Sequence, residues 1–338
     1  MFTVRDLSAM ESTVVSAQPR VSVIMPSYNT AHLIAGSLDS VRQQTFSDFE
    51  IIVVNDGSPD TTELERVLAP YLSRIVYIKQ ENKRAGGARN TAIGKARGEF
   101  LAFLDSDDAW LPDHLASQMQ LFEGEPALDL AYCNCLSVGD PSHPHDFMSR
   151  CPSDGPADFL ALVMERCQIP VSTVVARKSA LVRAGLFDAS LARCDDYDMW
   201  LRAAFHGAKI GYTRRVQARL NGGRPGSLGA SRAKMAEAYW KILQKAEQTL
   251  PLTPIDREVV QKRANEIRGR YLLEEGKFQL HQGQWDEARK LLSEANSYLR
   301  TSKVSLVLFG LSIAPSVTSK LAALVERIRD GVPPISGQ

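Results

Sequence analysis

Short apolar runs alternate with amphipathic segments through the N-terminal part of the chain. Four runs have the length and composition of buried strands, and segments with helical spacing of their apolar residues lie between them. The predicted strands are 21–25, 50–54, 74–79 and 100–104. Strands that alternate with helices predict a doubly wound α/β fold with a mostly parallel sheet and right-handed crossovers.

The pattern continues less regularly up to residue 220. Apolar runs at 128–135 and 171–176 predict two more strands, and the spacing in 193–205 predicts a helix. Residues 209–212 and 215–220 are typical of a final pair of strands. We expect this whole region to complete the α/β domain.

The pattern changes near residue 229, after a glycine-rich segment, because long helical segments then follow without strands. Gly276, Gly283, Ala288 and Ala295, with Trp285 between them, predict either one tetratricopeptide-like hairpin or two helices that pack only on the preceding domain. We therefore expect a flexible lead-in (1–20), an α/β domain (21–229, with halves 21–115 and 116–229), a C-terminal helical region (230–330) and a tail (331–338).

Three carboxylates, Asp105, Asp107 and Asp108, directly follow the predicted strand 100–104. Open α/β sheets bind ligands at the carboxyl ends of their strands. Carboxylates this close repel unless a cation shares them, and hard oxygen ligands suit Mg²⁺ or Mn²⁺. The alternative is an acidic loop that only precedes a helix opened by Pro112.

Composition and charge narrow the class of protein. The net charge of the 338 residues is +1, so no general attraction to nucleic acid is expected. The five cysteines lack metal-ligand spacing and predict free thiols. Residues 1–20 lack the apolar core of a signal peptide, and the apolar run 304–314 is shorter than the ~20 residues of a membrane span. We expect a cytoplasmic protein, and the amphipathic segment 321–328 leaves open peripheral contact with the inner face of a membrane or packing on the domain.

Five motifs in order resemble family 2 glycosyltransferases. They are VSVIMPSYN (21–29), VVNDGS (53–58), GGARN (86–90), FLDSDD (103–108) and DDYDMWLR (195–202). The resemblance covers residues 21 to about 228, roughly two thirds of the chain. It implies a GT-A fold, which is a Rossmann-like doubly wound sheet, and an inverting transferase that uses a nucleotide-diphosphate sugar.

The resemblance also implies a donor site in the half 21–115 and an acceptor site in the half 116–229. Tyr28 would lie against the nucleobase, Asp56 would accept a hydrogen bond from it, and Arg89 would face the base or the phosphates. Asp107 and Asp105 of the DxD motif would bind Mn²⁺ or Mg²⁺. The implied donor-binding residues are Pro26, Tyr28, Asn29, Asp56, Arg89, Asp105, Ser106 and Asp107.

The motif at 195–202 implies the acceptor side and the general base. By the resemblance Asp196 is the base, and Asp195 stands where relatives usually have Glu. Asp196 and Trp200 are four residues apart and share a helix face, with Tyr197 beside them on the acceptor side. The alternative is that both acids only favour the positive N-terminus of a helix.

One departure from the family pattern and one absent motif refine the functional hypothesis. The segment after the last strand has no His, and Arg224 is the candidate to bind the diphosphate there. The Gln-x-x-Arg-Trp motif of processive synthases is absent. We expect transfer of a single sugar, from a UDP-sugar, to a hydroxyl of a glycan, lipid-linked or protein acceptor in polysaccharide or cell-envelope biosynthesis.

Two other classes of protein remain as alternatives. One is a catalytically silent nucleotide-sugar-binding or scaffold protein that acts, or forms homo-oligomers, through its helical region. The other is a nucleotidyltransferase, which the sequence disfavours because Pro26–Thr30 is not a glycine-rich basic loop.

Overall fold

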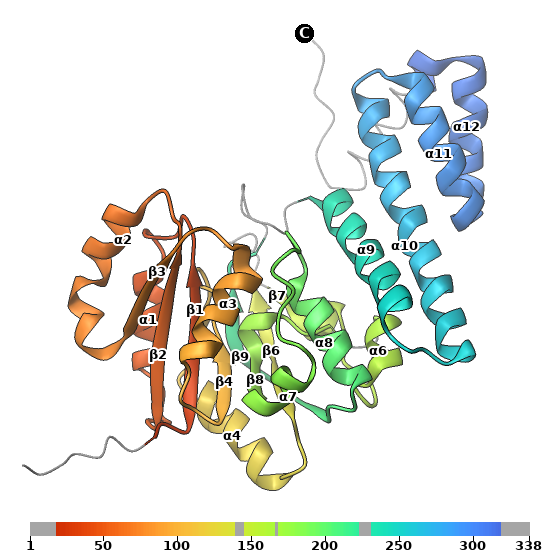
Figure 1. The fold of residues 1–338 in the computed structure, drawn as a ribbon. Coiled ribbons are helices and arrows are strands. Elements are labelled where there is room, and N and C mark those ends of the chain that lie inside the picture. The colour runs from red at the N-terminus through yellow and green to blue at the C-terminus, as the bar shows by residue number, and fades with distance from the viewer. Residues whose placement is uncertain (1–17, 139–144, 166–167, 223–230, 319–338) are drawn as a thin grey trace, which may run out of the picture.

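One twisted sheet forms the centre of the α/β part in the computed structural model (Figure 1). The structure describes residues 18–138, 145–165, 168–222 and 231–318. The first half of the sheet consists of β1 (Val21–Ser27), β2 (Phe49–Asp56), β3 (Val76–Gln80) and β4 (Phe100–Phe103). These strands lie in the order β3-β2-β1-β4, and all of their pairings are parallel. Their carboxyl ends therefore meet at one edge, as the alternating pattern predicts.

The second half of the sheet is mixed. It adds β5 (Ala109–Trp110), β6 (Leu130–Ser137), β7 (His145–Asp146), β8 (Val174–Arg177) and β9 (Ile210–Leu220). The pairing β6–β9 is parallel, whereas β8 runs antiparallel to both β4 and β6. The predicted α/β class is thus confirmed, and every antiparallel pair of the described strands includes a strand of this half.

Helices cover both faces of the sheet because side chains alternate along each strand. Ile24, Ile52 and Phe103 face one hydrophobic core, and Val23 and Val53 face the other. The helices of the α/β part are α1 (Ile34–Arg42), α2 (Thr61–Leu68), α3 (Arg84–Lys95), α4 (His114–Gly124), α5 (Phe147–Arg150), α6 (Phe159–Val163), α7 (Lys178–Arg183) and α8 (Asp195–Phe205), with 3₁₀ turns at Ala69–Arg74 and Val171–Thr173.

Some predicted boundaries differ from the structure. The expected pair of strands at 209–212 and 215–220 is one strand, β9. The register shifts on both sides of Asn134 of β6, because Cys133, Asn134 and Cys135 pair with Thr213, Val216 and Ala218. Three extra residues of β9 therefore bulge without ending the strand. The helix expected at Pro112 begins at His114, and residues 109–110 before it pair with β9 as β5.

Four long helices follow the sheet: α9 (Arg232–Thr249), α10 (Pro254–His281), α11 (Trp285–Leu299) and α12 (Ser302–Ile313). A Cβ on Gly269 would lie 2.8 Å from Leu299, and one on Gly276 would lie 2.8 Å from Leu292. These two pairs run in opposite directions, so α10 and α11 form an antiparallel hairpin whose close contact requires glycine. The predicted segment 321–328 lies outside the described residues.

The first of these helices packs on the α/β part. Ile242, Leu243 and Ala246 of α9 are buried in the same core as Met199 and Trp200 of α8. None of the described helices combines the length and the apolarity that a membrane crossing requires. The described cysteines are free thiols, as predicted, and Cys167 lies outside the described residues.

Candidate active site

The loops after β1 and β2 bring three of the expected donor-binding residues to the carboxyl edge of the sheet. Tyr28 is 52% exposed. Asn29 adopts a left-handed backbone with φ of 55°, and its N–H donates to Ser58 Oγ at 2.6 Å. Asp56 is buried, and its Oδ1 accepts from Gln80 Nε2 at 2.6 Å and from the Lys83 N–H at 2.8 Å. The exposed ring of Tyr28 and the carboxylate of Asp56, which its hydrogen bonds hold in place, thus lie near the same edge of the sheet.

Of two further expected residues, Pro26 lies in a strand and Ser106 links the loops after β1 and β4. Pro26 lies within β1 opposite Val54 of β2. Ser106 is buried, and its hydroxyl contacts the Thr30 hydroxyl at 2.7 Å. The loop after β1 is therefore held against the loop that carries the acidic residues.

The acidic residues after β4 form a compact cluster. Asp105, Asp107 and Asp108 each offer a carboxylate oxygen, and these oxygens lie within 4.8 Å of one another. Asp108 accepts from Ser172 Oγ at 2.6 Å and from the Asn221 N–H at 2.8 Å. Burial raises the pKa of Asp108 well above its ordinary value, and Asp107 and Asp105 raise it further. Such a set of hard oxygen donors fits a divalent cation.

Arg89 connects this cluster to the far side of the site. Its side chain is buried, with one terminal nitrogen donating to Asp105 Oδ1 and the other to Asp195 Oδ2, both at 2.6 Å. Burial alone would lower the pKa of this guanidinium, but Asp105, Asp195 and Asp196 together raise it above its ordinary value. The sequence led us to expect Arg89 at the base or phosphates, whereas the structure pairs it with protein carboxylates.

A close approach between α3 and the N-terminus of α8 makes this pairing geometrically possible. A Cβ on Gly86 of α3 would lie 3.2 Å from Asp195 Oδ2 and 3.2 Å from the Asp188 carbonyl oxygen. Cys194, just before α8, has a φ of 55°, so the chain turns sharply into the helix. Both glycines of the GGARN motif therefore lie inside α3, and Gly86 lets α3 approach the start of α8.

Asp196 lies in the first turn of α8, where it is partly exposed. Burial and then the charge of Asp195 raise its pKa to about 7, although Arg89 and the Tyr197 N–H partly oppose this. That N–H donates to Asp196 Oδ1 at 2.8 Å. A carboxyl group with a pKa near neutrality has the acid–base property that a general base needs.

A small cavity of about 40 Å³ lies beside Asp196. It is lined by Leu162, Glu165, Gln168, Ile169, Asp196, Tyr197, Trp200 and Tyr239. Trp200 is only 1% exposed, and its Nε1 donates to the Ile169 carbonyl at 3.1 Å, so most of its indole belongs to the core. The structure thus brings Asp196, Tyr197 and Trp200 to one cavity.

Sequence reasoning missed the residues that reach the site from distant segments. Ser172 and Asn221 contact the acidic cluster, and Tyr239 and Lys245 of α9 contact α8 or its cavity. No local pattern in the sequence marks these four residues. The one local signal nearby is the i,i+4 spacing of Asp198, the partner of Lys245, and Arg202, which is typical of a helical ion pair. Arg224 lies outside the described residues.

The family of the chain follows from comparison with known sequences. The model of glycosyl transferase family 2 matches residues 22–163. WfgD of Escherichia coli, named as a UDP-Glc:alpha-D-GlcNAc-diphosphoundecaprenol beta-1,3-glucosyltransferase, is 36% identical over 182 residues, which cover 54% of this chain and 68% of WfgD. An uncharacterized glycosyltransferase of Rickettsia typhi is 32% identical over 187 residues, which cover 54% of this chain and 58% of that protein. The chain therefore belongs to glycosyltransferase family 2, and it spans 58% of the length of the Rickettsia relative.

Solved structures share the fold. TarS of S. aureus (residues 1–349, in complex with UDP-GlcNAc) superposes with a TM-score of 0.58 at 18% identity and covers 93% of this chain and 92% of that one. The mannosyltransferase PcManGT of Pyrobaculum calidifontis, in complex with GDP-Man and Mn²⁺, gives a TM-score of 0.60 at 18% identity, with coverage of 92% and 88%. The predicted GT-A fold class is confirmed.

The ion pairs of Arg89 predict a specific cost for its loss. Arg89→Met leaves the buried Asp195 and the partly exposed Asp105 without this partner, so the free energy of unfolding in urea should fall by about 3–5 kcal/mol. The control is Arg66→Met, because Arg66 pairs with Glu63 on the exposed face of α2 and should cost at most about 1 kcal/mol. Equal losses in the two variants would show that Arg89 has no special role.

Proposed function

We propose that this protein is a metal-dependent, inverting glycosyltransferase that moves one sugar from a nucleotide sugar to an acceptor hydroxyl. The observation that carries the proposal is the pairing of Arg89 with both Asp105 and Asp195. It links a carboxylate cluster suited to a metal-bound diphosphate with the turn that holds a carboxyl group of pKa about 7. A sugar transferase needs both functions at neighbouring positions.

On the donor side, Asp107 and Asp105 would hold Mn²⁺ or Mg²⁺. A bound divalent cation neutralises the negative charge that develops on a leaving diphosphate. Tyr28 is exposed and would stack on the nucleobase, while Asp56 would accept a hydrogen bond from it. Pro26, Asn29 and Ser106 would fix the loops that carry these contacts. The similarity to WfgD, whose name specifies UDP-Glc, favours a UDP-sugar.

On the acceptor side, Asp196 would act as the general base. As the acceptor oxygen attacks the anomeric carbon, its proton passes to the Asp196 carboxylate and the bond to the nucleoside diphosphate breaks on the opposite face. A single displacement of this kind inverts the configuration at that carbon. Asp195, held by Arg89, would fix the start of α8 and so the position of Asp196.

The acceptor and the division of the chain are part of the proposal. The name of WfgD specifies a lipid-diphosphate-linked sugar, which favours a lipid-linked glycan as the acceptor and peripheral contact with the inner face of a membrane. We propose that residues 21–229 form the catalytic domain and residues 230–330 a helical region that follows it. Binding of the diphosphate by Arg224 and oligomerisation through the helical region stay predictions.

The role of the acidic cluster can be tested by binding alone. Asp107→Asn removes a charged ligand, so calorimetric titration with UDP and Mn²⁺ should give an affinity at least about 10- to 100-fold weaker than that of the wild type. EDTA should have the same effect on the wild type. The control is Asp113→Asn, because Asp113 pairs with Arg215 on the surface and should not affect UDP binding. UDP binding that is unaffected by EDTA would contradict metal dependence.

The role of Asp196 predicts a separation of chemistry from donor binding. Asp196→Asn cannot take a proton, so kcat should fall about 10²- to 10⁴-fold while UDP affinity is unchanged. The base must be unprotonated and its pKa is about 7, so log kcat of the wild type should rise with unit slope below about pH 7 and level off above it. Near-normal turnover of Asp196→Asn would exclude Asp196 as the base.

A further inference from the structure

One wall of the cavity beside Asp196 comes from the helical region that follows the sheet. Tyr239 belongs to α9, and its ring meets that of Tyr197 edge to face, with centroids 4.7 Å apart and an interplanar angle of 68°. Tyr197 in turn donates its hydroxyl to the Leu162 carbonyl at 3.3 Å. The cavity is therefore enclosed by α6, α8 and α9 together.

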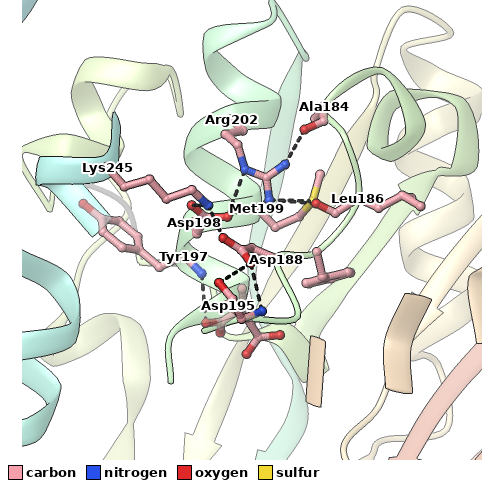
Figure 2. A network of polar contacts seen from close by, with 12 residues as sticks. Ala184, Leu186, Asp188, Asp195, Tyr197, Asp198, Met199, Arg202 and Lys245 are labelled. Carbon is pink, nitrogen blue, oxygen red and sulfur yellow. Dashed lines mark hydrogen bonds and ion pairs between the residues drawn. The ribbon is translucent and has the colours of Figure 1, made fainter. Parts of the chain in front are cut away.

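Helix α9 is anchored to α8 by a network of charges (Figure 2). Lys245 donates to Asp198 Oδ1 at 2.7 Å and to Asp188 Oδ2 at 2.6 Å. The other oxygen of Asp198 accepts from Arg202, which also donates to the carbonyl oxygens of Ala184 and Leu186. These contacts fix α9 and Tyr239 relative to the helix that carries Asp196.

A second contact from the helical region holds one of the residues that line the cavity. Arg263 of α10 is buried and holds Glu165 Oε2 at 2.5 Å. Glu165 lines the same cavity as Asp196 and Tyr239. Two helices beyond residue 229 thus determine the composition of this space.

The size and lining of the cavity indicate what it can take. A cavity of about 40 Å³ is larger than the roughly 10–15 Å³ that a single buried water needs, so it has room for a hydroxyl or hydroxymethyl group. Its polar groups include the carboxyl groups of Asp196 and Glu165, which accept hydrogen bonds from hydroxyls. Arg263 balances the charge of Glu165, so Asp196 is the carboxylate here that would repel an anion. Burial raises the pKa of Tyr239, so its hydroxyl keeps its proton and can donate.

We propose that Tyr239 of α9 contacts the acceptor, and that the cavity formed by α6, α8 and α9 receives the attacking hydroxyl of an uncharged sugar. The inference rests on the proposed function, because it takes Asp196 as the base. It makes the helical region part of the acceptor site. It also assigns the choice between neutral and anionic acceptors to Asp196.

The test uses UDP release from UDP-glucose and UDP-GlcNAc, stimulated by methyl glycosides of glucose, N-acetylglucosamine and glucuronic acid. A neutral glycoside should accelerate release by the full-length wild type, and the glucuronide should not. Tyr239→Ala should raise the half-saturating glycoside concentration about 10- to 200-fold, with the KM of the donor unchanged. Tyr239→Phe, which keeps the ring, should show a smaller increase.

The control is Trp240→Leu, since Trp240 is the next aromatic residue of α9 but stacks on Tyr271 of α10. It should leave the half-saturating concentration unchanged. Unchanged stimulation in Tyr239→Ala, equal stimulation by the glucuronide, or no stimulation by either neutral glycoside while UDP still binds would each overturn the proposal. Full stimulation in Asp196→Asn would instead contradict the proposed function.

Discussion

The arrangement of the candidate site depends on one buried cation. Arg89 lies between Asp105, which follows β4, and Asp195, which begins α8, and it donates to both at 2.6 Å. Burying a guanidinium costs free energy unless charged partners surround it, and buried carboxylates near one another need a cation in the same way. The buried guanidinium therefore requires the two carboxylates, and the carboxylates require the guanidinium. The result is that two segments separated by 90 residues of chain meet at a fixed distance.

The same group of charges sets the acid–base property of Asp196. Burial and Asp195 raise its pKa, while Arg89 lowers it, and the balance lies at about 7. Without Arg89 the charges of Asp195 and Asp105 would raise it further. A single ion-pair network thus supports the acidic cluster, orients the start of α8 and sets the protonation of the candidate base. The helical region also helps to fix the start of α8, because Lys245 of α9 donates to Asp198, three residues after Asp195.

Local patterns predicted much of the fold and the identity of the acids, and long-range contacts account for the rest. The run 100–104 and the acids after it are local features, and β4 and the acidic cluster lie where they predict. The partners of Arg89 are 16 and 106 residues away, so sequence spacing could not reveal them. The bulge that keeps β9 continuous depends on its register with β6, and the place of Tyr239 beside Tyr197 depends on how α9 packs.

The central claim is that the carboxylates after β4 bind a donor diphosphate through a metal ion, across Arg89 from Asp196. Its most direct test is a crystal structure with UDP and Mn²⁺, in which anomalous scattering locates the ion. The account predicts an anomalous peak within coordination distance of an Asp107 carboxylate oxygen, with the diphosphate bound to the same ion and the uracil against Tyr28. A diphosphate bound elsewhere, or a cluster that takes no ion while UDP is bound, would contradict the account.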